Sequence, residues 1–225
     1  GEIVAMMGRN GAGKSTLLRS MVGLASVADG KVRVEGQDPS QLSPTELIRC
    51  VGLVPQEAGD LLWSDEVSKE CQAADKDSNS AAGSSWALFE RLTPGVDPAT
   101  HPRDLSEGQR LALALAVTLV SSAPVLLLDE PTRGLDYPTK TRLIALLRDH
   151  AASGGCVVLA THDVELVAEV ATRTVVLADG EIVADGVTSD IVVGSPQFAP
   201  QIAKVLAPLP WLTVTDVIAA LPEAG

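Results

Sequence analysis

The chain has 225 residues, of which 46% are apolar and 20% charged, values that are ordinary for a folded globular protein and exclude a largely disordered chain. Asp and Glu outnumber Lys and Arg by 29 to 17, so the formal net charge is −12. We expect no nucleic-acid partner, because binding phosphate backbones needs a basic face. Three scattered cysteines without metal-ligand spacing favour reduced thiols in a cytosolic setting.

The first predicted element is an apolar strand over residues 2–7, which runs directly into the glycine-rich sequence GRNGAGKS at residues 8–15. A strand that feeds such a loop normally lies inside a sheet, so this abrupt beginning suggests a piece of a longer protein. The segment that starts at Lys14, KSTLLRSMVGL, is predicted to be a helix.

Residues 8–15, the phosphate loop, fit the pattern G-x-x-x-x-G-K-[ST]. Its glycines let successive backbone N–H groups turn toward phosphate oxygens, and the following helix adds the positive end of its dipole. Lys14 is expected to reach the β- and γ-phosphates, and the Ser15 hydroxyl to bind Mg²⁺. The predicted nucleotide-binding residues of this region are Gly8, Asn10, Gly11, Gly13, Lys14, Ser15 and Thr16.

Residues 57–104 are polar and acidic, and they follow an apolar run that ends at Gln56. Helix-like patterns over residues 64–74 and 80–92, with prolines after them, predict a small helical lobe. We expect Trp63, Trp86 and Phe89 to form the core of this lobe. The alternative is a groove for a partner helix near Gln56.

The segment VLLLDE, residues 125–130, predicts a buried parallel strand that ends in two carboxylates. Ligands of α/β sheets bind at the carboxyl ends of the strands. Together with the phosphate loop, the pair predicts that Asp129 holds Mg²⁺ and that Glu130 orients and deprotonates an attacking water. Before this strand, the apolar run over residues 111–120 predicts a buried helix.

Further motifs stand in a fixed order: Gln56, then LSEGQ at residues 105–109, then Gly-Leu-Asp at residues 134–136, and Thr-His-Asp at residues 161–163 after a strand at 156–160. With the phosphate loop and the carboxylate pair, they resemble the nucleotide-binding domain of ABC ATPases over residues 1 to about 190. The resemblance implies an α/β P-loop NTPase fold: a mainly parallel sheet flanked by helices, an inserted helical lobe, and N-terminal strands that are missing here.

The implied domain organisation is a RecA-like ATP-binding core in two parts, residues 1–62 and 111–190. The helical lobe occupies residues 63–110 and ends in the signature segment, residues 105–109. Residues 191–225 are a helical tail, in which residues 198–206 can form one or two turns. Thr213 and Asp216 predict a capping box that opens a last helix to Leu221.

The resemblance also implies roles for individual residues. Gln56 contacts Mg²⁺, the attacking water and a transmembrane partner, and His162 contacts the γ-phosphate. Asp136 links the two sites of a pair of ATPase domains. Three residues of the signature segment cap ATP bound to the opposite domain: Ser106, Gly108 and Gln109. The cofactors are ATP and Mg²⁺, the catalytic residues are Lys14, Gln56, Glu130 and His162, and the Mg²⁺ ligands are Ser15, Gln56 and Asp129.

Three features depart from the family pattern. The signature segment carries Glu107 where glycine is commonest, and we expect its side chain to point away from the phosphates. Arg133 and Gly134 stand where a serine–alanine pair is more usual. The aromatic residue that stacks on adenine belongs upstream of the phosphate loop, in a region that this chain lacks.

The segments PQEAGDLLWSDEVSKEC and LDEPTRGLD and the tail from residue 195 resemble ATPases of energy-coupling-factor (ECF) importers, in particular the second half of fused two-ATPase forms. This implies a second ABC ATPase domain in a head-to-tail dimer, a transmembrane coupling protein and a membrane substrate-binding protein as partners. The location would be the cytoplasmic face of the membrane. Alternatives are an exporter ATPase, a soluble ABC ATPase of the cluster-assembly or translation type, and a non-catalytic nucleotide sensor.

Overall fold

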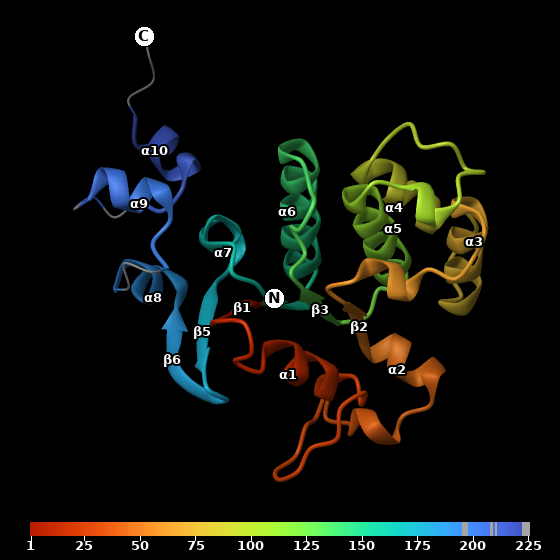
Figure 1. The fold of residues 1–225 in the computed structure, drawn as a ribbon, viewed down its shortest axis with the longest axis horizontal. Coiled ribbons are helices and arrows are strands. Elements are labelled where there is room, and N and C mark those ends of the chain that lie inside the picture. The colour runs from red at the N-terminus through yellow and green to blue at the C-terminus, as the bar shows by residue number, and fades with distance from the viewer. Residues whose placement is uncertain (195–197, 208, 210, 222–225) are drawn as a thin grey trace.

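The computed structural model describes residues 1–194, 198–207, 209 and 211–221. Its centre is a six-stranded sheet with the order β2-β3-β4-β1-β5-β6 (Figure 1). All neighbouring strands are parallel except β5 and β6, which form an antiparallel pair. The strands are β1 (Ile3–Met7), β2 (Val51–Val54), β3 (Val125–Asp129), β4 (Cys156–Ala160), β5 (Arg173–Ala178) and β6 (Glu181–Val187). The predicted α/β fold with a mainly parallel sheet is confirmed, and β1 lies inside the sheet as expected.

The sheet is covered on both faces, which explains why its central strands are apolar throughout. Along β3, Leu126 and Leu128 pack into the core cluster that includes residues of α5 (Glu107–Leu119) and α6 (Tyr137–Ala152). Leu127, which points the opposite way, packs with Leu18 of α1 (Lys14–Met21) in a second cluster. Figure 1 shows α1 and α6 on opposite sides of the strands. This packing fixes the carboxyl end of β3 beside the phosphate loop.

Helices α1, α2, α6 and α7 flank the sheet. Helices α3, α4 and α5 pack against one another, and α5 also packs against β2 (Figure 1). The apolar run predicted as a buried helix lies in α5, where every residue from Leu111 to Ala116 is buried. The helices are α1 (Lys14–Met21), α2 (Pro44–Cys50), α3 (Val67–Asp77), α4 (Ser84–Leu92), α5 (Glu107–Leu119), α6 (Tyr137–Ala152), α7 (Val164–Val170), α8 (Thr188–Gly194), α9 (Gln201–Leu206) and α10 (Val214–Ala220).

The two lobe helices begin three or four residues later than the sequence pattern predicts. Buried Glu70 accepts hydrogen bonds from the backbone N–H groups of Trp63 and Ser64, at 2.9 and 2.6 Å, so the chain stays extended before α3. Asp75, also buried, accepts from the backbone N–H groups of Gly83 and Ser85 and thereby sets the start of α4.

The expected lobe core is right for two of its three aromatic residues. Phe89 is fully buried, and Trp86 meets it edge-on with ring centroids 5.8 Å apart. The prediction was wrong for Trp63, whose exposed fraction is 87%. Trp63 lies in the loop held by Glu70, outside the packed helices, and lines a groove instead.

The tail contains the predicted capping box: the Asp216 N–H donates to the Thr213 hydroxyl at 3.1 Å, and the Asp216 carboxylate accepts from the Thr213 N–H. The parts of the predicted tail at 195–197, 208, 210 and 222–225 lie outside the described residues. Within the ranges that the structure describes, no helix has the length and apolar character needed to cross a membrane.

Candidate active site

The phosphate loop joins β1 to α1 in a backbone shape that requires glycine. Gly8 has φ +149°, and a Cβ at this position would lie 2.3 Å from the carbonyl oxygen of Leu177 on β5. Gly13, the residue before α1, has φ +101° with open space beside it. The Lys14 side chain is buried under the loop and donates to the carbonyl oxygens of Gly8 and Arg9 at 2.8 and 3.3 Å. The loop thus presents open backbone and a buried cation, the features that bind phosphates.

The carboxylate pair stands at the end of β3, as predicted. Asp129 is buried, and Glu130 has φ +53°, a conformation that is strained for a residue with a side chain. One carboxylate oxygen of Glu130 lies 2.8 Å from His162 Nδ1, and the other accepts from the Thr161 hydroxyl at 3.2 Å. The structure therefore brings together Glu130, the predicted base, and His162, which is predicted to contact the γ-phosphate, from the loops that follow β3 and β4.

These residues line one cleft of about 410 Å³, the nucleotide cleft. Its lining contains nearly all the predicted phosphate-loop residues and the four predicted catalytic residues. The residues are Asn10, Gly11, Gly13, Lys14, Ser15, Thr16, Gln56, Asp129, Glu130, Arg133 and His162. Gly8, whose close contact with β5 shapes the loop, lines the two adjoining pockets.

The predicted Mg²⁺ ligands fit that ion. Ser15, Gln56 and Asp129 supply a hydroxyl, an amide and a carboxylate oxygen to the same cleft, and oxygen donors of this kind are what Mg²⁺ prefers. Because Mg²⁺ keeps several waters and phosphate oxygens in its coordination shell, three protein donors are sufficient.

The signature segment and Asp136 do not line this cleft. Ser106 caps α5, accepting from the Gln109 N–H at 3.2 Å, and the Gln109 side chain accepts from the Ser106 N–H at 2.9 Å. Asp136 caps α6 by accepting from the Thr139 N–H, and this hydrogen-bonded pairing lowers the pKa of its carboxyl. Within this chain these residues have helix-capping roles. Their predicted contacts with ATP require a second domain.

Two features of the site were not predicted from the sequence. Arg133 lines the cleft and pairs with Glu57 and Glu107, which are far from it in sequence. Asp163, next to His162, accepts from Lys140 at 2.7 Å and from Thr132 at 3.0 Å. A cation three residues after the carboxylate pair was a visible signal for Arg133, but its two partners depend on the tertiary fold.

Sequence comparison connects this constellation with known proteins. Residues 1–133 match the ABC transporter family. The chain is 62% identical over 221 residues to a Streptomyces avermitilis protein provisionally named ABC transporter ATP-binding protein, covering 98% of this chain and 39% of that protein. A Geobacter sulfurreducens protein with the same kind of name is 36% identical over 85% of this chain and 70% of its own length. The chain spans about two fifths of the length of its Streptomyces relatives.

Solved structures share the fold. A dimeric bacterial ABC transporter cassette superposes with a TM-score of 0.72 at 25% identity, covering 83% of this chain and 85% of that one. A bacterial Atm1-family ABC exporter with ATP bound gives a TM-score of 0.68 at 27% identity, covering 88% of this chain and 36% of that one.

Proposed function

This chain belongs to the ABC transporter family, and on that premise we propose that it is the ATP-hydrolysing part of a transporter that imports a vitamin or a transition-metal ion. The contact between Glu130 and His162 across the nucleotide cleft carries the catalytic part of this proposal. The import direction and the cargo class rest on the resemblance of residues 55–71, 128–136 and the tail to ECF importer ATPases.

The chemistry follows from the positions of the side chains. Lys14 neutralises charge on the β- and γ-phosphates, while the glycine backbone of the phosphate loop holds their oxygens. Ser15, Gln56 and Asp129 hold Mg²⁺, which when bound stabilises the charge that develops on the phosphates. Glu130 accepts a proton from the attacking water, and His162 fixes the orientation of the Glu130 carboxylate.

A second ABC domain completes the site. The nucleotide cleft is open, and Ser106 and Gly108 of the same chain lie outside it at the start of α5. In a head-to-tail pair, the Ser106 hydroxyl, the Gly108 N–H and the N-terminal end of α5 approach the γ-phosphate held by the opposite domain. Closure of the pair excludes water and positions the phosphate for attack.

A groove between α2, β2 and the helical lobe is proposed as the docking site for a helix of the transmembrane coupling protein. It has a volume of about 290 Å³ and is lined by apolar side chains of α2, β2 and the lobe, including Ile48, Leu53 and Leu61. Trp63 stands at its edge, exposed, with its backbone anchored by Glu70. An exposed tryptophan on a fixed backbone is the kind of residue that dominates binding at interfaces. Docking at this groove would hold the chain at the cytoplasmic face of the membrane.

Affinity purification of the full-length protein from its source membranes tests the transport assignment. We expect small polytopic membrane proteins to co-purify and the change Trp63→Ala to release most of them, without loss of ATP binding. The matched control is Tyr137→Ala, because Tyr137 is equally exposed, at 82%, and lies away from the groove. Recovery of only soluble assembly factors or ribosomes would contradict the transport assignment. Unchanged recovery of membrane proteins with Trp63→Ala would contradict docking at the groove.

A further inference from the structure

One arginine connects three loops of the site. Arg133 donates from Nη1 to the Glu57 carboxylate at 2.8 Å, and its Nε lies 3.0 Å from the Glu107 carboxylate. Glu57 follows Gln56 directly, and Glu107 belongs to the signature segment. We propose that Arg133 is a positioning residue, which holds these loops in one arrangement and thereby sets the position of Glu130. The effect on turnover rests on the proposed ATPase function.

We call the pairing of Arg133 with Glu57 and Glu107 the bridge. The backbones beneath it are in close contact. A Cβ on Gly108 would lie 2.7 Å from the carbonyl oxygen of Gly134, and a Cβ on Gly134 would lie within about 3 Å of the Glu107 side chain. The Glu107 side chain therefore lies over Gly134 and reaches Arg133. The two departures from the family pattern, at Glu107 and at Arg133–Gly134, are therefore parts of a single contact.

Arginine suits this position because its planar guanidinium carries several donors and can serve two carboxylates at once. Without it, Glu57 and Glu107 would lie near each other as like charges, and their repulsion would separate the lobe from the loop after Gln56. The Arg133 N–H donates to the Glu130 carbonyl oxygen at 3.2 Å, so a displacement of this arginine also moves the strained backbone of Glu130.

The rival explanation is direct contact with phosphate, because Arg133 also lines the nucleotide cleft. The two explanations differ in the role of the carboxylates. A positioning arginine needs Glu57 and Glu107, and its loss slows turnover with little effect on ATP affinity. A phosphate-binding arginine is weakened by both carboxylates, and its loss reduces ATP affinity.

The change Arg133→Met in the full-length protein separates these explanations. We expect kcat to fall about tenfold, because small displacements of a catalytic group cost this much or more, while KM for ATP stays within about twofold. The melting temperature should not change, since exposed ion pairs contribute little to stability. Arg91→Met is the matched control, because it removes an equally exposed pair with Asp149 at 2.8 Å, and we expect it to have no effect.

The double variant Arg133→Met with Glu107→Gln should be no slower than Arg133→Met alone, because both changes break the same bridge. Exchanging the charges, Arg133→Glu with Glu107→Arg, should recover part of the lost kcat relative to Arg133→Glu alone. The positioning role would be overturned if Arg133→Met raised KM for ATP while Glu107→Gln left kcat unchanged. Fully additive losses of kcat in the double variant would also overturn it.

Hydrogen exchange without nucleotide gives a readout that needs no ATPase activity. In Arg133→Met we expect faster exchange at the Asp60, Gln109 and Leu135 amides, which are hydrogen-bonded within the three connected loops. Arg91→Met should leave them unchanged. Unchanged exchange in Arg133→Met would overturn the bridge. The expected exchange pattern in a protein without ATPase activity would support the bridge and contradict the proposed function.

Discussion

At the scale of single residues, Glu130 combines an unfavourable backbone conformation with a fixed side chain. Its N–H donates to the Ala160 carbonyl oxygen at 2.8 Å, and its carboxylate is held by Thr161 and His162. A non-glycine residue at φ +53° costs about 1–3 kcal/mol, and the neighbouring strand has to stabilise it. Glu130 in this conformation lines the nucleotide cleft, as its proposed role toward an attacking water requires.

The phosphate loop gives a direct test of local geometry through Gly8. We predict that Gly8→Ala lowers the free energy of unfolding by several kcal/mol, because the added Cβ would meet backbone of β5 at 2.3 Å. The control Gly180→Ala also forces a residue to positive φ, here +83°, but into open space, and should cost about 1 kcal/mol. Chemical denaturation measures both, and equal losses would contradict the close approach at Gly8.

The residues of the phosphate loop and the carboxylate pair were predictable because their chemistry requires a short sequence pattern. The bridge at Arg133 was not, since Glu57 is 76 positions away along the chain. The exposure of Trp63 was also missed, because a buried and an exposed tryptophan look alike in a polar segment. The position of Trp63 depends on Glu70, a buried carboxylate that accepts a hydrogen bond from the Trp63 backbone and holds its loop outside the packed helices.

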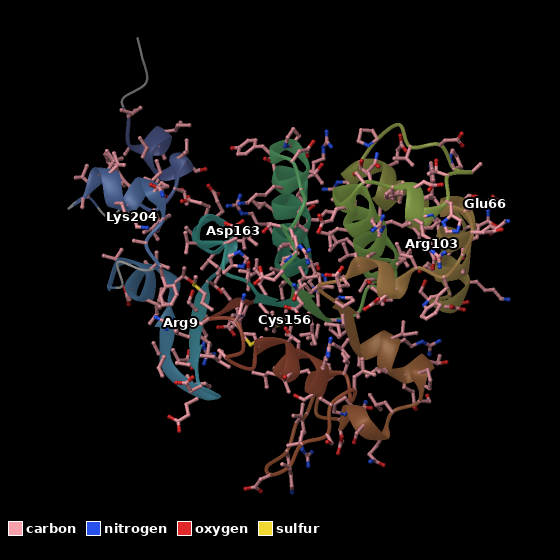
Figure 2. The ribbon with its side chains drawn as sticks, viewed as in Figure 1. Arg9, Glu66, Arg103, Cys156, Asp163 and Lys204 are labelled. Atoms are coloured by element: carbon pink, nitrogen blue, oxygen red, sulfur yellow. The ribbon has the colours of Figure 1, made fainter. Side chains whose placement is uncertain are left out.

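At the scale of elements, an ion pair connects α6 to the start of α7. Lys140 Nζ lies 2.7 Å from the Asp163 carboxylate, and both side chains are only 22% exposed. Figure 2 shows Asp163 between these two helices. Burial alone would raise the pKa of Asp163, but the hydrogen bonds from Lys140, Leu166 and Thr132 outweigh it and lower the pKa.

We predict that Lys140→Met lowers stability at pH 7 by about 1–3 kcal/mol, because Asp163 is then buried without its cation. The pKa of Asp163 is lowered in the folded state, so its charge stabilises the fold above its ordinary pKa of 3.8, and this contribution is lost as the pH falls below that value. The difference between variant and wild type should therefore shrink below about pH 4.

Unfolding free energies between pH 7 and pH 3 measure this effect. Lys69→Met is the control, because Lys69 pairs with Asp65 and Glu66 at half-exposed positions and should change stability little. A difference between Lys140→Met and wild type that stays constant over the whole pH range would contradict the role of Asp163.

Helix and strand types were well predicted, because apolar runs and 3.6-residue spacing are local signals. The order of the strands in the sheet was not predicted. The apolar runs of β1, β3 and β4 are alike, and the order that puts β1 between β4 and β5 depends on how the connecting helices cross the sheet. The starts of α3 and α4 were misplaced because buried carboxylates of the lobe hold the preceding backbone.

At the scale of the whole molecule, the order of the strands brings the residues of the candidate site together. Strands β3, β4 and β1 are adjacent, so the loops after them meet at one edge although residues 8, 130 and 162 are far apart in sequence. The signature segment lies at the start of α5, and none of its residues lines the nucleotide cleft. This geometry supports the proposal that a second domain completes the site, and the solved cassette with this fold is dimeric.

Phosphate release by Glu130→Gln in the full-length protein tests whether Glu130 activates the attacking water. We predict that this variant binds ATP as tightly as wild type, releases phosphate at least about a hundredfold more slowly, and accumulates as an ATP-bound pair of domains. Glu181→Gln, at an exposed position on β6, is the control and should keep wild-type turnover. Retained phosphate release by Glu130→Gln would show that Glu130 does not activate the water.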